Sequence, residues 1–178
     1  MTESLVWVPA VERLQLLADP VRTAIENDPA LAGAEASEID PAFADTDALH
    51  AQYGVEPGDC ANCVVVAGRR GDQLSFAACL VLAASRADVN GMVRRHLGAR
   101  KASFAPLAEV VDRTGMEFGS ITPVGLPASW SLLIDEAVAG HPAVVIGGGR
   151  RQAKLRVPGS VLAGLPAAKV LSGLAVGS

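Results

Sequence analysis

The chain has 178 residues and a formal net charge of −4, and half of its residues are apolar although only 4% are aromatic. A chain of this length can bury a full core as one domain, and three cysteines are too few for a disulfide framework. The longest apolar run has about a dozen residues where a membrane span needs about 20, and the first residues lack the positive charge of a secretory signal. We therefore expect a soluble cytoplasmic protein that has no membrane partner.

Helix and strand signals alternate irregularly along the chain. β-branched residues mark the strands, Gly54, Gly98 and Gly115 mark helix ends, and Pro20 interrupts the first helix. In chain order, the predicted elements are a helix at 10–27, a strand at 36–39, a helix at 46–53, strands at 63–67 and 74–84, a helix at 88–97, a strand at 101–104, a helix at 106–114, strands at 131–135, 143–146 and 152–157, and a helix at 158–165. Tight turns join several strands, which favours a mixed sheet over a purely parallel one.

Cys60 and Cys63 have the C-x-x-C spacing of redox pairs and metal sites. A redox pair normally begins a helix, whose dipole lowers the thiol pKa, but here the second cysteine begins a valine-rich strand. A structural zinc site needs four ligands, and the remaining cysteine and the three histidines are scattered without a second paired motif. We expect two small, half-buried thiols and neither a metal nor a cofactor; a redox pair, a zinc site and a cysteine nucleophile are the alternatives.

Charge is unevenly distributed along the chain. Residues 1–68 hold twelve acidic and two basic residues, whereas residues 69–101 hold seven basic and two acidic residues. Residues 150–156 add four basic residues and no acid. If the two basic segments converge in the fold, they form a positive face suited to a polyanion. The alternative is a set of scattered, solvated arginines.

Two glycine-containing segments are candidates for binding an anion or a carbonyl oxygen. Residues 147–149 are three glycines after a strand, followed by two arginines, but they match neither a P-loop nor a dinucleotide fingerprint. Residues 119–127 combine glycines, which permit positive φ, with prolines, which stiffen the loop. A stiff loop with free amides can hold a carbonyl oxygen or its oxyanion. The alternatives are a tight turn for the first segment and an ordinary surface loop for the second.

Three stretches in fixed order identify a resemblance: LGARKASFAPLAEVVDRTGMEFGSITPVGLP at 97–127, LLID at 132–135, and VVIGGGRRQAKLRVPGSVLAGL at 144–165. Together they resemble the YbaK/ProX-type aminoacyl-tRNA editing domains over about residues 36–175. The resemblance implies an α/β fold with a mixed, strongly curved sheet and surrounding helices. We accordingly expect an editing domain at 36–178, preceded by a helical N-terminal extension at 1–35.

The resemblance also implies site residues. The family's Gly-x-x-x-Pro loop matches Gly119 and Pro123, its acid after an apolar strand matches Asp135, and its glycine turn matches residues 147–149. Asn62 stands where most relatives carry a lysine, and we expect it to point into the pocket while Cys63 turns the other way. The expected catalytic residues are Asn62, Gly119 and Asp135. The expected substrate-binding residues are Ser120, Ile121, Thr122, Pro123, Gly125, Gly147, Gly148 and Gly149. The expected RNA-binding residues are Arg69, Arg70, Arg94, Arg95, Arg150, Arg151 and Lys154.

The function implied by the resemblance is translation fidelity through a free-standing aminoacyl-tRNA deacylase. This hydrolase would act in trans on a mischarged tRNA, with Cys- or Ala-tRNA for proline as candidates. The expected partners are the acceptor end of aminoacyl-tRNA and, as a second candidate, a synthetase; the oligomeric state stays open. Losing the lysine charge at Asn62 would cost about 2–4 kcal/mol of transition-state stabilisation. One alternative is therefore a catalytically weak or inactive homologue that binds tRNA or an amino-acid-like ligand, and another is a pocket for an unrelated small ester or amide.

Overall fold

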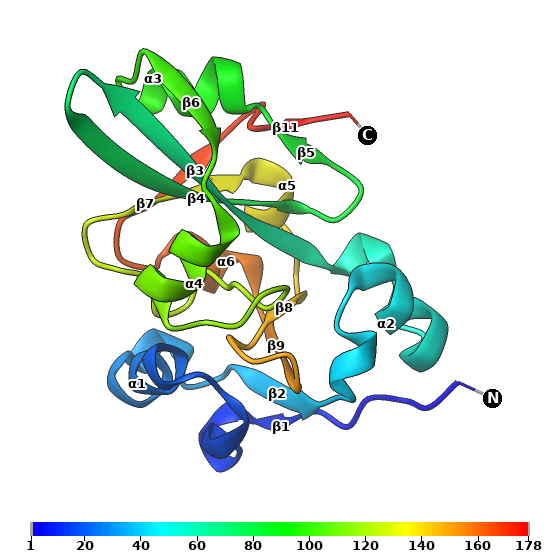
Figure 1. The fold of residues 1–178 in the computed structure, drawn as a ribbon. Coiled ribbons are helices and arrows are strands. Elements are labelled where there is room, and N and C mark those ends of the chain that lie inside the picture. Colours follow the sequence, from blue (N-terminus) through cyan, green and yellow to red (C-terminus); the bar gives the residue numbers. More distant parts are fainter. Residues whose placement is uncertain (1, 178) are drawn as a thin grey trace.

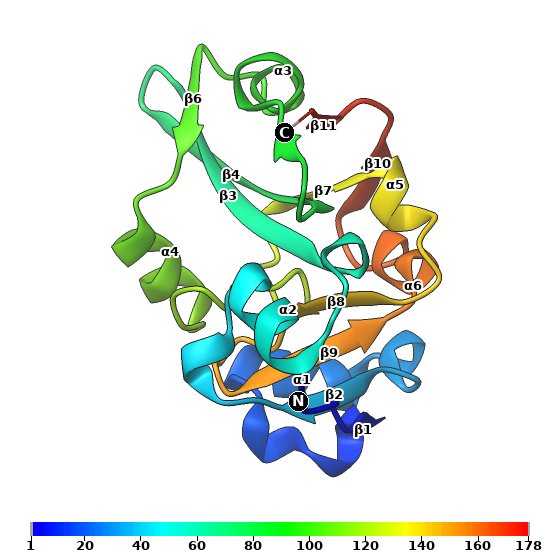
Figure 2. The ribbon, with the colours of Figure 1, turned by 90° about the vertical axis from the view of Figure 1, so that its right-hand side faces the viewer.

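The computed structural model describes residues 2–177, and its largest sheet has five strands in the order β10-β7-β4-β3-β6 (Figures 1 and 2). These strands are β3 (Ala61–Arg70), β4 (Gln73–Leu82), β6 (Lys101–Phe104), β7 (Ser131–Asp135) and β10 (Ala168–Leu171). The β3–β4 and β3–β6 pairs are antiparallel, whereas β7 runs parallel to both β4 and β10. The sheet is therefore mixed, as the tight turns predict.

Two smaller sheets complete the strand framework. The order β1-β2-β9-β8 forms an antiparallel sheet, and β5 pairs with β11. These strands are β1 (Val8–Pro9), β2 (Glu35–Glu38), β8 (Val144–Gly147), β9 (Ala153–Val157), β5 (Arg86–Ala87) and β11 (Ala175–Val176). A single bridge between Cys60 and Val145 links β8 to the start of the β3 segment. The expected mixed α/β fold is confirmed, with the strands divided among three sheets rather than placed in one.

Short helices lie around the sheets, and several end where glycine signals predict. The α-helices are α1 (Asp19–Asn27), α2 (Thr46–Tyr53), α3 (Arg94–His96), α4 (Leu107–Thr114), α5 (Glu136–Ala139) and α6 (Gly159–Ala163). Gly54 and Gly115 follow α2 and α4 in the left-handed conformation expected of C-terminal glycines. None of the helices within residues 2–177 is long and apolar enough to cross a membrane.

The first predicted helix is wrong in its N-terminal half. Residues 10–12 and 14–16 form separate 3-10 turns, and α1 begins only at Asp19 with Pro20 in its first turn. Proline fits that position because the first N–H groups of a helix have no intrahelical partner. Local signals also missed α5, a single turn of four residues, and β1, β5, β10 and β11, which have two to four residues each and depend on long-range pairing.

The segment before residue 36 packs into the same core as strands β7 and β9. Leu17 and Val21 are fully buried in a cluster that also contains Ile134 and Leu155. Gly149 has a φ of +82°, and a Cβ there would lie 2.5 Å from the Cβ of Ala18, so only glycine lets these two segments approach.

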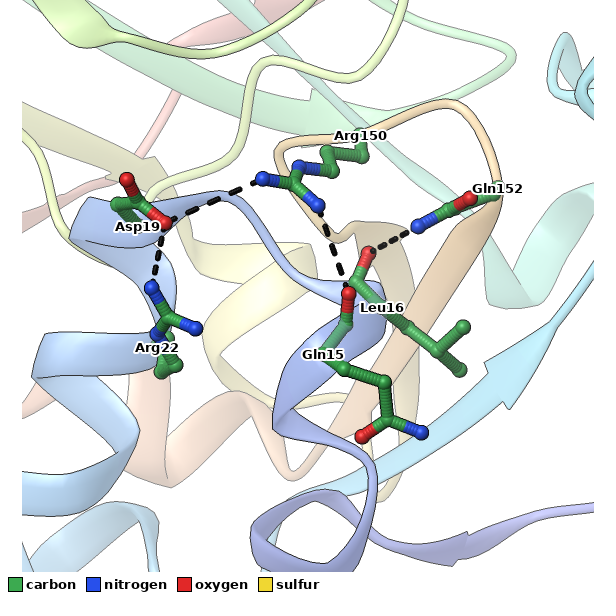
Figure 3. A network of polar contacts seen from close by, with 6 residues as sticks. All are labelled: Gln15, Leu16, Asp19, Arg22, Arg150 and Gln152. Atoms are coloured by element: carbon green, nitrogen blue, oxygen red, sulfur yellow. Dashed lines mark hydrogen bonds and ion pairs between the residues drawn. The ribbon is translucent and has the colours of Figure 1, made fainter.

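Side chains reinforce this contact between the N-terminal segment and the β8–β9 turn (Figure 3). Arg150 lies 3.9 Å from the carboxylate of Asp19, which also pairs with Arg22 at 2.6 Å. Gln152 donates a hydrogen bond to the Leu16 carbonyl at 3.4 Å. The N-terminal segment thus supports the back of the turn that helps to form the pocket described next.

Candidate functional site

A cavity of about 460 Å³ lies beside the first half of β3. β6 pairs with β3 only over residues 66–69, so residues 61–65 have no ladder partner on that side and line the cavity instead. Asn62 and Gly119 both line it, as the resemblance predicts. The lining residues are Ala44, Asp45, Thr46, Ala61, Asn62, Cys63, Val64, Val65, Phe104, Ala105, Leu107, Val110, Phe118, Gly119, Ile121, Gly147 and Lys154.

Lys154 lies at the cavity and not on the RNA-binding face where the sequence analysis placed it. We expected it on an RNA-binding face, but it lies on β9, is only 9% exposed and lines the cavity. It pairs across the ladder with Gly147, where the backbone of Ser120 and Ile121 packs so closely that a Cβ would lie 2.7 Å from the Ser120 carbonyl oxygen. Its one sequence signal was a lysine between Ala153 and Leu155, where a charged side chain interrupts a buried strand.

The Lys154 amine has no charged partner of its own. Among residues 2–177 it forms neither an ion pair nor a side-chain hydrogen bond. Burial lowers its pKa below that of an ordinary lysine; Cys60 and Asp45 oppose this shift, and Arg151 adds to it. The Lys154 ammonium is largely desolvated and has no ion pair in the described chain, so it can bind an anion or a developing negative charge, which would repay its desolvation.

The loop at Gly119 is held in place by the β8–β9 turn. The Gly149 N–H donates to the Ser120 carbonyl at 3.0 Å, and the Glu117 N–H donates to the Gly149 carbonyl at 2.7 Å. Gly119 itself has a φ of +77°, a left-handed conformation that favours glycine, and a Cβ there would meet the Arg151 guanidinium. Among the described residues, the N–H groups of Gly119 and Ile121 have no acceptor. These amides are free to donate to a substrate oxygen.

The expected substrate-binding residues divide between the cavity and its support. Ile121 and Gly147 line the cavity. Ser120 and Thr122 are buried at 1% and 0% exposure, and their hydroxyls have no hydrogen-bond partner in the described part of the chain. Gly148 packs against Ala153 and Leu17, and Gly149 packs against Ala18 and Val21. Pro123 and Gly125 line a different groove against α1, so the expectation that they contact the same substrate is corrected.

The alternation of β3 places Asn62 and Cys63 on opposite faces. Asn62 is exposed at the cavity, whereas Cys63 packs against the main core. Cys63 also lines the cavity, as do all of residues 61–65. Burial raises the pKa of the Cys63 thiol, and it raises the pKa of Cys60 to about 11 and that of Cys79 to about 12. Thiolates are thus disfavoured at neutral pH, which argues against a cysteine nucleophile and a redox pair.

Asp135 does not lie at the cavity, which corrects its expected catalytic role. It is 5% exposed, and its two carboxylate oxygens accept hydrogen bonds from the N–H groups of Ala137 at 3.0 Å and Ala175 at 2.9 Å. The first contact caps α5, and the second fixes the C-terminal segment. Both oxygens are therefore committed to the backbone, as in a structural N-cap.

The two basic segments do not form one face. The end of β3, β5, α3 and β6, which hold the basic residues of the first segment, lie at one end of the molecule, and the β8–β9 turn lies toward the other end (Figure 1). Arg150 contacts Asp19 and the Gln15 carbonyl, while Arg151 donates to the Phe118 and Pro41 carbonyls. The expectation that these two arginines bind RNA together with residues 69–95 is corrected, because they hold the loops around the cavity.

Comparisons with known proteins identify the family of the chain. The chain matches the family model of the aminoacyl-tRNA editing domain over residues 40–165. No curated protein matches it. A solved protein proposed as a trans-editing enzyme for prolyl tRNA synthetase is 25% identical, with a TM-score of 0.72, and the match covers 93% of this chain and 96% of that one.

Two further solved structures share the fold. One, from work on grafting epitope backbones onto scaffold proteins, is 25% identical with a TM-score of 0.73, covering 87% of this chain and 95% of that one. The other, a hypothetical protein, is 22% identical with a TM-score of 0.76, covering 89% of this chain and all of that one. The family match spans well over half of the sequence and includes the cavity residues of β3, the Gly119 loop and β9. The chain therefore belongs to the aminoacyl-tRNA editing domain family.

Proposed function

We propose that this chain is a free-standing deacylase that hydrolyses the ester of a mischarged aminoacyl-tRNA in trans. The observation that carries the proposal is one cavity lined by an unpaired buried ammonium at Lys154, the Gly119 loop and Asn62. Family membership supports a deacylase role. The likeness to the protein proposed to edit for prolyl tRNA synthetase supports Cys- or Ala-tRNA for proline as the substrates to test first.

The cavity offers what ester hydrolysis requires. Water adds to the carbonyl carbon, the bond between that carbon and the ribose oxygen breaks, and the ribose leaves with a proton. Negative charge develops on the carbonyl oxygen, where the Lys154 ammonium and the free amides of Gly119 and Ile121 stabilise it. Asn62, with two donors and one acceptor, orients the attacking water.

Asp45 provides the carboxylate that binds the α-ammonium of the aminoacyl group. Within the described part of the chain, Asp45 is the only acidic residue that lines the cavity. Its side chain is 74% exposed and lies at the start of α2. The α-ammonium of an aminoacyl ester needs a negative partner, which this carboxylate provides. Asp45 thus binds the α-ammonium, and Lys154 faces the carbonyl oxygen that becomes negative in the transition state.

The test is a deacylation assay with tRNAs charged with Cys, Ala, Ser and Pro. Gly119→Ala disturbs the loop, since it strains a positive φ and meets Arg151. Gly71→Ala is the matched control, because Gly71 also has a positive φ of 60° but has nothing within 4 Å of an added Cβ. We expect turnover of at least one mischarged tRNA by the wild type, a loss in Gly119→Ala and retention in Gly71→Ala. No turnover of any of the four contradicts the proposal.

A second candidate function is binding without hydrolysis. The observation that favours it is the uncharged side chain of Asn62 at a position lining the cavity. Under this alternative the wild type binds charged tRNA without turnover, and Asn62→Lys gains activity. Under the deacylase proposal the wild type already turns over, because Lys154 provides the charge from β9.

A further inference from the structure

Exposed apolar side chains gather at the mouth of the cavity. Phe104 and Phe118 are 62% and 60% exposed, Leu107 is 45% exposed, and all three line it. Phe104 and Phe118 are two of only four phenylalanines in the chain. A small ester would be held inside the cavity and does not explain aromatic rings at its rim. Exposed aromatic rings do suit unpaired nucleobases, which stack on them without sequence preference.

A second hollow, of about 510 Å³, is lined by basic residues. Arg69, Arg94, Arg100 and Lys101 line it, and no acidic side chain does so among residues 2–177. Arg69 and Lys101 are direct partners in the β3–β6 ladder. Like charges in directly opposite positions destabilise a sheet, and an anion bound between them would relieve this repulsion. We call this hollow, with its four basic residues, the basic hollow.

β6 connects the basic hollow to the rim. Its first residues, Lys101 to Ser103, line the hollow, and its last residue, Phe104, lines the cavity. The strand lies at one edge of the five-stranded sheet, and Figure 2 shows it leading from the α3 end of the molecule toward α4. Its four residues span about 10 Å at about 3.3 Å each, which matches about three stacked nucleotides at 3.4 Å each.

We propose that the edge of β6 is the docking track for the single-stranded 3′ end of RNA, with bases stacked on Phe104 and Phe118 and phosphates held in the basic hollow. This inference rests on the proposed function, because it identifies how the RNA part of that substrate reaches the cavity. The two kinds of side chain bind different parts of the RNA. The aromatic rings bind the nucleotides next to the ester, and the basic residues bind the RNA backbone upstream of them. Because neither group reads base edges, the track is insensitive to sequence.

The test measures binding of an uncharged RNA hairpin with a single-stranded 3′ end, so that hydrolysis plays no part. Phe104→Ala and Phe118→Ala are each expected to weaken binding at least fivefold, the lower end for one lost stacked base. A blunt hairpin without the overhang should bind wild type and both variants equally. Both side chains are exposed, so thermal melting should be unchanged and folding does not confound the result.

The charge test uses the double variant Arg100→Ala with Lys101→Ala. It should reduce the slope of log affinity against log salt by about 1.4, because each single-strand phosphate contact contributes about 0.7. Arg86→Ala with Lys169→Ala removes the same charge from exposed residues that line neither the cavity nor the hollow, and it should leave the slope unchanged. The inference is overturned if the phenylalanine variants bind the overhang like wild type, or if the two double variants behave alike.

Failure of the two proposals is distinguishable. A wild type that binds the overhang through these residues but hydrolyses no charged tRNA would overturn the deacylase proposal and leave the docking track standing. A wild type that hydrolyses charged tRNA, while the phenylalanine and basic variants retain full affinity, would overturn the docking track alone.

Discussion

Replacing Lys154 with methionine removes the ammonium from the cavity and keeps most of the buried aliphatic stem. An ammonium about 4 Å from a developing oxyanion gains about 4 kcal/mol at an effective dielectric constant of about 20. The loss of one oxyanion donor is known to cost about 2.7–4 kcal/mol, or 10²–10³ in rate. We therefore expect Lys154→Met to lower kcat/KM for the preferred mischarged tRNA by about 10²–10³.

The thermal stability of Lys154→Met should not fall together with its activity. This difference separates a chemical role of Lys154 from a structural one. Lys154 is 9% exposed and has no ion pair in the described chain, and its pKa is lowered chiefly by desolvation, so the folded protein bears a cost for the buried charge. Methionine removes that cost, and the melting temperature at neutral pH should stay the same or rise. Lys169→Met, at an exposed lysine on β10, is the matched control and should change neither quantity.

The pH dependence offers an independent readout of the same group. Because the Lys154 pKa is lowered, the amine loses its proton at a lower pH than an ordinary lysine would. Activity that depends on the charged form should therefore decline on the alkaline side before an ordinary lysine titrates, and Lys154→Arg should remove that decline. A Lys154→Met variant with kcat/KM within about threefold of wild type would refute the assignment, as would a loss of activity that only parallels a loss of stability.

Three further predictions concern residues around the cavity. Asp135→Ala should lower the free energy of unfolding by about 1–2 kcal/mol, the cost of a lost cap, without changing kcat/KM; a specific loss of kcat/KM would restore its catalytic role. Gly149→Ala should lower the melting temperature by several degrees because its Cβ would collide with Ala18 and Val21, and a melting curve identical to wild type would contradict this packing. Iodoacetamide at pH 8 should alkylate the folded protein slowly and leave turnover intact, because a pKa of about 11 at Cys60 leaves about 100-fold less thiolate than a pKa of 9.0; rapid inactivation, followed by mass spectrometry to locate the label, would reopen a thiol mechanism.

Elements with strong local signals were predictable from the sequence. The valines of β3 and the glycines at 54 and 115 specify a strand and two helix ends through interactions within a few residues, and the structure has all three. The family and the Gly119 loop could also be identified, because a left-handed glycine followed by a stiffening proline is a local device. The strand pairs β5–β11 and β7–β10 could not be predicted, since short strands become stable only through partners distant in the chain.

The contents of the cavity were decided by tertiary structure. In the sequence, Lys154 is only a charged residue that interrupts an apolar strand; the β8–β9 ladder, which pairs it with Gly147, is what places it at the cavity. Nothing near Asp135 in the sequence predicts that the N–H group of Ala175, forty residues further along the chain, donates to its second carboxylate oxygen. The sequence alone determined the family, the fold class and the flexible and stiff points of the backbone, because these depend on neighbouring residues. Which charges share a cavity depends on sheet register and on contacts across the whole chain, and only the folded structure determines those.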